Sequence, residues 1–276
     1  MSKSLPIAIV IPHAGLAIPP ELAEHVALTE EQIFNEADAY TDLLYDFRRR
    51  VAQWHSFPYA RAILDVNRPK DAHAMIRAGD GFVKQRTSYG ANVFKDGFVP
   101  DDALVQTLIA NYWQAWHDTM ASLAEDDSIK LVIDAHSMAG HAPQGYDATQ
   151  AVRPRVALCN LGDEDGNPRD ETGHLSAPPE LVREAGAIFG EVLSGIDDVS
   201  ATSAPYAVNK PYYGGPILWL HGGKAQPWLM IELSRATYIG AQTGDSPVVP
   251  ADMARIAQIR EQLWQGIERV VDLLSY

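Results

Sequence analysis

The chain has 276 residues, a formal net charge of −14 and a single cysteine, Cys159. This length suits one large α/β domain, and no Pro-, Gly- or Ser-rich linker divides the chain, so we expect a single domain over residues 1–276. The negative charge disfavours binding to nucleic acid and to anionic membranes. No segment has the roughly 18 apolar residues that a membrane span needs, and one cysteine allows no intrachain disulfide, which favours a cytoplasmic protein.

Short apolar runs alternate with amphipathic stretches along the chain. The runs predict buried strands at 7–11, 62–66, 130–134, 155–158 and 228–233. The stretches with helical spacing of apolar residues predict helices at 42–54, 101–123, 181–192 and 251–274. Two polar stretches, 68–100 and 163–178, read as long loops. This alternation predicts an α/β fold in which helices cover both faces of a mostly parallel sheet.

Polar side chains follow or interrupt the predicted strands. His13 follows the first strand and His136 the third, while Asn67 and Arg68 follow the second and Glu232 lies within the last. Ligands of such sheets bind at the carboxyl ends of the strands, so these side chains are expected to converge. Imidazoles bind metal ions, and a carboxylate can deprotonate a water, so the set is typical of a metal-dependent hydrolase.

Each of these residues also has a structural interpretation. A single histidine after a strand is more often a hydrogen-bonded loop residue than a metal ligand. Asp134 can accept from a nearby backbone N–H, or it can orient His136 if both side chains point the same way. Glu232 is harder to explain structurally, because a carboxylate within an apolar strand is costly unless it is paired, bound or neutralised.

Six short motifs in chain order resemble those of the N-formylglutamate amidohydrolase family. They lie at 11–15 (IPHAG), 38–44 (DAYTDLL), 65–68 (DVNR), 134–138 (DAHSM), 213–215 (YGG) and 231–235 (IELSR). The family is similar to the zinc carboxypeptidases and aspartoacylases, so the resemblance implies a zinc-carboxypeptidase-like fold with three α/β/α layers around a twisted, mostly parallel mixed sheet. It also implies one catalytic zinc ion per chain, with His13 and His136 as ligands and Glu232 as the general base.

The second zinc ligand is where the chain departs from the carboxypeptidase pattern. There a glutamate follows the first histidine by three residues, but this chain has Leu16 at that position. The family motif points to Asp38 instead, with Glu36 and Asp42 as neighbouring carboxylates that could serve.

The arginines indicate how an anionic substrate could be bound by a negatively charged protein. We expect Arg61 to stabilise the oxyanion, and Asn67 with Arg68 to bind a substrate carboxylate. Arg86 and Arg235 are candidates for a second carboxylate, such as that of a glutamate side chain. The resemblance thus implies hydrolysis of an anionic N-acyl amino acid such as N-formyl-L-glutamate. A related zinc hydrolase for another N-acyl amino acid or a small peptide is the alternative enzyme, and a binding protein without catalysis is the alternative of another class; the oligomeric state is left open.

Overall fold

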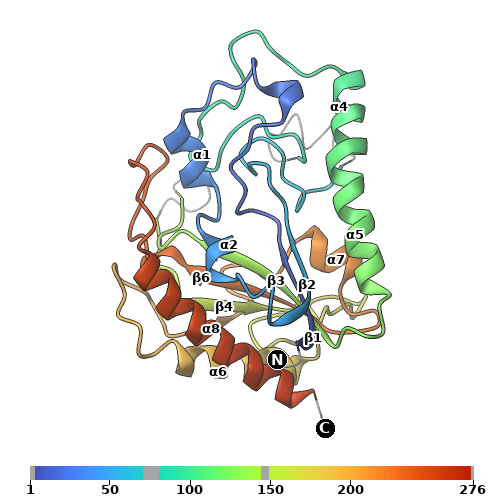
Figure 1. The fold of residues 1–276 in the computed structure, drawn as a ribbon, viewed down its shortest axis with the longest axis vertical. Coiled ribbons are helices and arrows are strands. Elements are labelled where there is room, and N and C mark those ends of the chain that lie inside the picture. Colours follow the sequence, from blue (N-terminus) through green and yellow to red (C-terminus); the bar gives the residue numbers. More distant parts are fainter. Residues whose placement is uncertain (1–3, 71–80, 144–148, 275–276) are drawn as a thin grey trace.

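A six-stranded mixed sheet forms the centre of the protein (Figure 1). The computed structural model describes residues 4–70, 81–143 and 149–274. The strand order is β2–β1–β3–β6–β4–β5, with bounds β1 Leu5–Ile11, β2 Val51–Ser56, β3 Leu131–Met138, β4 Val156–Cys159, β5 Ala207–Val208 and β6 Trp228–Ser234. Strands β2, β1, β3 and β6 run parallel to one another, whereas β4 runs antiparallel to β6 and β5 is parallel to β4.

Helices cover both faces of this sheet. Their bounds are α1 Glu30–Glu36, α2 Thr41–Leu44, α4 Asp102–Leu108, α5 Ala115–Ala124, α6 Pro179–Val192, α7 Pro216–His221 and α8 Met253–Leu273, with single-turn 3₁₀ segments at Pro20–Leu22 and Arg235–Thr237. A π-helical segment, Ile109–Gln114, joins α4 to α5, so that the predicted helix 101–123 is one continuous rod (Figure 1). Together these elements make three layers, α/β/α, as the sequence predicts.

Alternating residues of β1 explain the two cores. Ile7 and Ile9 pack into the cluster that holds α6 and α8, whereas Ala8 and Val10 pack into the cluster that holds α4 and α5. Successive side chains of a strand point to opposite faces, so a strand that is covered on both sides must be apolar at every position. The continuous apolar run in the sequence is therefore the signature of the central strand position that β1 occupies.

The predicted helix at 42–54 is wrong. Only Thr41–Leu44 is helical, and Val51–Ser56 forms the edge strand β2, parallel to β1. Phe47 and Trp54 satisfy a helical spacing, but turns at residues 45–50 reverse the chain between them. Both side chains still pack into the α6–α8 core, so burial was predicted correctly and the secondary structure was not.

The predicted strand at 62–66 is also wrong. These residues form buried turns, in which the Ile63 and Leu64 N–H groups both donate to the carbonyl of Ala60. The run is apolar because it packs beneath α5, in the same cluster as Trp116. Part of the predicted loop 68–100 lies outside the described residues, at 71–80.

The sequence did not predict α1, α7 and β5. The other predicted strands and helices are found within a few residues of their predicted bounds. The largest difference is that β3 extends to Met138, which places His136 inside the strand. No helix among the described residues is long and apolar enough to cross a membrane.

Candidate metal centre and substrate pocket

Three adjacent parallel strands deliver the central residues of the site. His13 lies two residues beyond the end of β1, His136 lies in β3, and Glu232 lies in β6. His136 and Glu232 are direct partners in the β3–β6 register. The site therefore sits at the carboxyl edge of the sheet centre, where α/β sheets bind their ligands.

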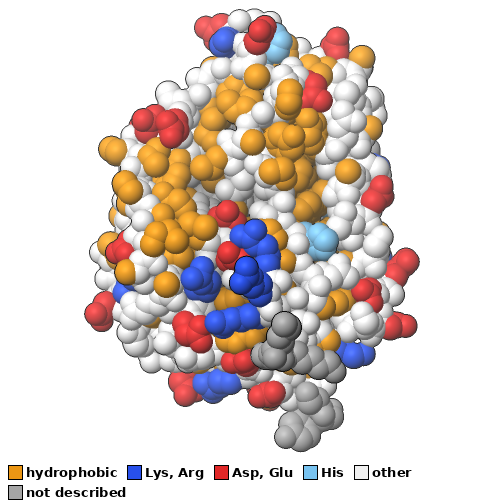
Figure 2. Space-filling model, viewed as in Figure 1, with side chains coloured by type: hydrophobic (Ala, Val, Ile, Leu, Met, Phe, Trp, Pro, Cys, Tyr) orange, Lys and Arg blue, Asp and Glu red, His pale blue; other side chains and the backbone are white. Residues whose placement is uncertain are grey.

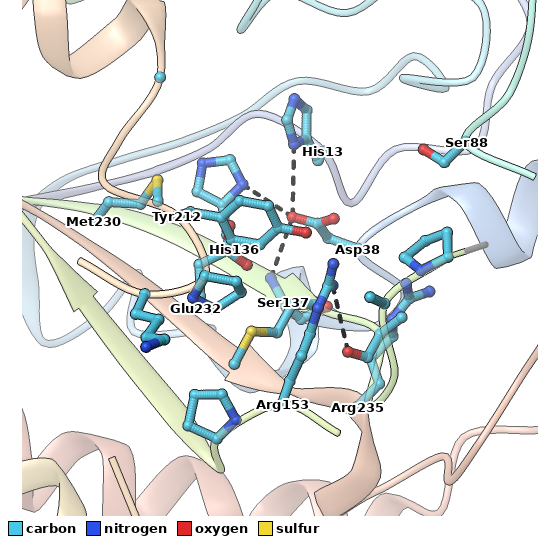
Figure 3. A pocket seen from close by; sticks show the side chains of 18 of the residues that line it. His13, Asp38, Ser88, His136, Ser137, Arg153, Tyr212, Met230, Glu232 and Arg235 are labelled. Atoms are coloured by element: carbon cyan, nitrogen blue, oxygen red, sulfur yellow. Dashed lines mark hydrogen bonds and ion pairs between the residues drawn. The ribbon is translucent and has the colours of Figure 1, made fainter. Parts of the chain in front are cut away.

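Asp38 joins the two histidines from the loop between α1 and α2. Its Oδ2 atom lies 3.0 Å from Nδ1 of His136 and 3.6 Å from Nδ1 of His13, and it also accepts a hydrogen bond of 3.1 Å from the backbone N–H of Ser137 (Figure 3). The Asp38 N–H donates to the carbonyl of His13, which holds the loop against the end of β1. All three side chains are buried.

A second carboxylate lies behind each histidine. Nε2 of His13 is 2.8 Å from Oδ1 of Asp65, and Nε2 of His136 is 3.1 Å from Oδ1 of Asp134. Metal-bound histidines commonly carry such a carboxylate on the outer nitrogen, where it fixes the ring and its tautomer. Asp134 and His136, two residues apart on one strand, thus share a face, as the sequence allowed.

The residues fit a metal ion on the evidence of their donor atoms. The Nδ1 atom of His13 is buried without a hydrogen-bond partner, although it faces Asp38. Two imidazole nitrogens and one carboxylate oxygen within 4.8 Å of one another form the group of described residues able to hold a metal. Such a nitrogen and oxygen set is the kind that catalytic zinc uses.

The two alternative carboxylates have other partners, although Glu36 also lines the cavity beside the histidines. Glu36 accepts hydrogen bonds from the backbone and hydroxyl of Ser88, at 2.8 and 2.7 Å. Asp42 accepts from the backbone N–H of Leu43 at the start of α2. Asp38 is therefore the carboxylate that the fold places with the histidines.

The electrostatics of the site favour a positive charge at its centre. Burial disfavours the ionised form of Asp38, but hydrogen bonds and charge from His13 and His136 outweigh it and hold its pKa well below the usual range. Burial also disfavours the charged form of His136 and so acts to lower its pKa. The negative charge of Asp134 and the hydrogen-bonding contacts with Asp134 and Asp38 outweigh burial and raise the pKa of His136 well above its ordinary value. Surroundings that bind a proton this tightly also favour a metal cation in its place.

A cavity of about 780 Å³ opens beside this group, within the size range of small-molecule sites. Glu232 lines it, and burial raises the pKa of its carboxyl group. Of the described residues, five with cationic side chains line the same cavity: Arg61, Arg68, Arg153, Lys210 and Arg235. Figure 2 shows Lys and Arg side chains gathered near the middle of one face, with acidic side chains among them and an apolar surface above.

The motif around residue 65 reaches the cavity although it is a turn and not a strand end. Arg61 lies 3.4 Å from Asp38 and 3.1 Å from Asp65, so it spans the carboxylate between the two histidines and the one behind His13. Asn67 is fixed by its own N–H, which donates to Asp65, and by its Oδ1, which accepts from the N–H of Ile217. Gly215 makes room for Asn67, because a Cβ there would lie 2.5 Å from the Asn67 amide nitrogen.

The two arginines predicted for a second carboxylate are placed differently. Arg86 is exposed and does not line the cavity, so the structure does not support its predicted contact with substrate. Arg235 lines the cavity, but one of its terminal nitrogens donates to the backbone carbonyls of Asn35 and Ala37, both at 2.9 Å. It therefore anchors the segment that leads into Asp38.

Several residues of the cavity wall were not predicted from the sequence, among them Arg153 and Tyr212. Both lie outside the predicted strand ends, in segments before β4 and after β5. For Arg153 the missing information is the antiparallel direction of β4, which places the amino end of β4 beside the carboxyl ends of the parallel strands. One sequence read without its topology does not reveal that direction.

A mixed α/β sheet with a buried two-histidine, one-carboxylate group and a buried glutamate beside a cavity is typical of a hydrolase-like α/β domain. Comparison with known proteins then gives the family. The profile of the N-formylglutamate amidohydrolases matches residues 5–239, and the chain belongs to that family. It is therefore a member of a family of amide hydrolases that act on small molecules.

Solved structures support the same fold. An N-formylglutamate amidohydrolase from Ralstonia eutropha JMP134 aligns over 98% of this chain and 94% of its own, with a TM-score of 0.70 at 19% identity. The gene product Atu2144 from Agrobacterium tumefaciens aligns over 96% of this chain and 90% of its own, with a TM-score of 0.56 at 15% identity. At these identities the likeness concerns the fold alone. A search of curated protein sequences found no significant match.

Proposed function

We propose that this protein is a zinc-dependent enzyme that hydrolyses the amide bond of an N-acyl amino acid such as N-formyl-L-glutamate. The observation that carries the proposal is the group of His13, Asp38 and His136, which stands one strand away from Glu232 at the edge of a substrate-sized cavity. Family membership supports the amide as the bond that is cleaved.

His13 and His136 would hold the zinc ion through their Nδ1 atoms, and Asp38 through a carboxylate oxygen. When bound, zinc supplies a Lewis acid that acidifies water and polarises an amide carbonyl. Asp65 and Asp134 keep the two imidazoles oriented by their contacts with the outer nitrogens.

Glu232 is proposed as the general base. It takes a proton from the attacking water and passes it to the amine that leaves. An effective base has a pKa near the working pH, and burial shifts the pKa of Glu232 upward, in the required direction. Its position opposite His136 in the sheet register fixes it beside the metal ligands.

Asn67 and Arg68 are proposed to bind the carboxylate next to the scissile amide. The side-chain oxygen of Asn67 is engaged by the N–H of Ile217, which leaves its amide nitrogen as the donor for a ligand. Arg68 lines the cavity and offers a planar guanidinium, which suits a carboxylate. Arg61, beside Asp38, supplies positive charge where the amide oxygen becomes negative.

The test is Glu232→Gln, which preserves shape and removes the base. We expect kcat for N-formyl-L-glutamate to fall about 10²- to 10⁴-fold, while about one zinc ion per chain is retained. Asp42→Asn is the matched control, because Asp42 is not among the residues that line the cavity and accepts a hydrogen bond from the N–H of Leu43, so its kcat should stay within about threefold of the wild type. Full turnover by Glu232→Gln would refute the assignment of the base.

A further inference from the structure

Most cations of the cavity already have an anionic partner. Arg61 lies within 3.4 Å of Asp38 and nearer still to Asp65, and Arg68 lies 4.0 Å from Asp65. Lys210 forms an ion pair of 3.2 Å with Glu164. Their charges are therefore partly neutralised by the protein itself.

Arg153 differs from these three. It is only 6% exposed, yet among the described residues no Asp or Glu oxygen lies within the 4.0 Å of an ion pair. Its Nε atom is buried without a hydrogen-bond partner, and one terminal nitrogen makes a single long hydrogen bond, 3.4 Å, to the carbonyl of Ala139. A buried guanidinium with so few partners is costly, and a ligand anion would remove most of that cost.

The side chain of Arg153 is held so that it points into the cavity. Its guanidinium carbon lies 5.0 Å from the centre of the Tyr212 ring, which supports it from one side. Figure 3 shows the side chain extending toward the group of His13, Asp38 and His136. A cation that is both fixed in direction and unpaired is suited to bind an anionic group of a substrate.

The topology separates Arg153 from the predicted site for the first carboxylate. Arg68 follows the edge strand β2, at one end of the strand order, whereas Arg153 precedes β4 on the other side of β6. Because β4 runs antiparallel to β6, its amino end lies at the carboxyl edge of the parallel strands. His13, His136 and Glu232 lie in or just after the strands β1, β3 and β6, between the two arginines, so a substrate centred there has a cation on either side.

Arg235 also has no carboxylate partner within the described part of the chain, but its geometry favours a different role. Two hydrogen bonds of 2.9 Å tie it to the backbone before Asp38. Arg153 makes no comparable bond and is the freer of the two guanidinium groups.

We propose that Arg153 binds the side-chain carboxylate of the substrate and thereby selects N-acyl amino acids with an acidic side chain. The inference rests on the proposed function and adds the residue that sets its specificity. A substrate with a neutral side chain would leave the buried guanidinium of Arg153 without an anion. Discrimination therefore arises from the unfavourable complex with a neutral substrate as much as from the favourable complex with an acidic one.

The test compares an acidic with a neutral side chain of the same shape. Turnover of N-formyl-L-glutamate and N-formyl-L-glutamine is measured with the wild type, Arg153→Met and Arg153→Lys. We expect Arg153→Met to lower kcat/KM for the glutamate substrate about 10- to 100-fold and to change that for the glutamine substrate less than about threefold. Arg153→Lys keeps the charge but loses the planar fork, so it should restore part of the preference.

Binding provides a readout that does not depend on turnover. Calorimetry with the products L-glutamate and L-glutamine should show tighter binding of L-glutamate by the wild type, and loss of that preference in Arg153→Met. Arg49→Met is the matched control: it removes the same charge from an exposed position before β2, at the opposite edge of the sheet, and should bind both ligands as the wild type does. Thermal unfolding and zinc content of each variant report on its folding.

The outcomes separate the inference from the proposed function. A wild type that cleaves neither substrate refutes the proposed function, while a binding preference that depends on Arg153 still supports the inference. A wild type without preference for the acidic ligand, or an Arg153→Met variant that weakens both ligands equally, overturns the inference.

Discussion

Two pairs of buried histidines among the residues that the structure describes have opposite surroundings. His13 and His136 lie with their ring centres 4.7 Å apart, and three buried aspartates lie within 4 Å of their nitrogens: Asp38, Asp65 and Asp134. In the second pair, Nδ1 of His117 lies 2.8 Å from Nε2 of His221. There the outer nitrogen of His117 meets the carbonyl of Val66, and Nδ1 of His221 has no hydrogen-bond partner.

The carboxylates account for the difference between the pairs. In the second pair burial alone dominates and lowers the pKa of His117 to about 4 and that of His221 to about 3, so both rings are neutral. In the first pair the aspartates outweigh burial and hold the pKa of His136 above its ordinary value. Proximity of two histidines is thus not sufficient for a metal site, and the surrounding negative charge is what suits the first pair to a cation.

Removing the carboxylate that the first histidine pair shares should have the largest effect on zinc binding and activity. Asp38→Ala leaves the two histidines without their shared carboxylate, so we expect zinc to be lost and kcat/KM to fall on the order of 10³-fold or more. Zinc content by mass spectrometry and turnover of N-formyl-L-glutamate measure the two effects. A variant that keeps both would show that the pair binds metal without Asp38.

The carboxylates behind the histidines should have a smaller effect. Asp65→Asn and Asp134→Asn preserve shape but weaken the hold on the outer imidazole nitrogens, and each should lower zinc affinity about 10- to 100-fold. Competition with a chelator measures the affinity. Asp42→Asn is the control, since Asp42 contacts neither histidine, and equal affinities in all three variants would contradict the role of Asp65 and Asp134.

The neutral pair, His117 and His221, should make the free energy of unfolding depend on pH. The folded pKa of His117, about 4, lies below the unfolded value of about 6.5, so the unfolded chain binds the proton first as pH falls. The contribution is therefore complete above pH ~6.5 and is lost as pH falls toward 4, on the order of 2 kcal/mol between pH 6.5 and 4.5 from His117 alone. Urea unfolding of the wild type and His117→Gln at several pH values tests this, and equal pH slopes in the two proteins would contradict it.

A change in the pair of His117 and His221 should have the smallest effect on zinc content. His221→Asn changes a buried ring on α7 that contacts His117, and the structure places neither residue at the cavity. We expect about one zinc ion per chain and kcat within about twofold of the wild type. Loss of zinc in this variant would mean that the two pairs are not independent.

Much of the fold could be predicted, because fully covered strands and long helices carry strong local patterns. Strands β1, β3 and β6 are mostly apolar and buried on both faces, and α6 and α8 show clear apolar stripes. The edge strand β2 has only one covered face, and its sequence fits a helical spacing as well as a strand. Local pattern could not decide between the two, since pairing with β1 is a long-range contact.

The site was predictable where its residues lie on those strands. His13, His136 and Glu232 could be named because polar residues in or after buried strands are conspicuous. Asp65 and Asn67 reach the site from a buried turn. The sequence predicted a strand there, so their place near the site was expected but the reason given for it was wrong. Arg153 could not be found, because its place depends on the antiparallel direction of β4.

The central claim is that His13, Asp38 and His136 form a zinc site. The most direct test is the metal content of the protein purified without a histidine tag, compared with His136→Ala. We predict about one zinc ion per wild-type chain and almost none in the variant. A wild type that stays free of metal after zinc is supplied at neutral pH, or a variant that retains the ion, would contradict the account.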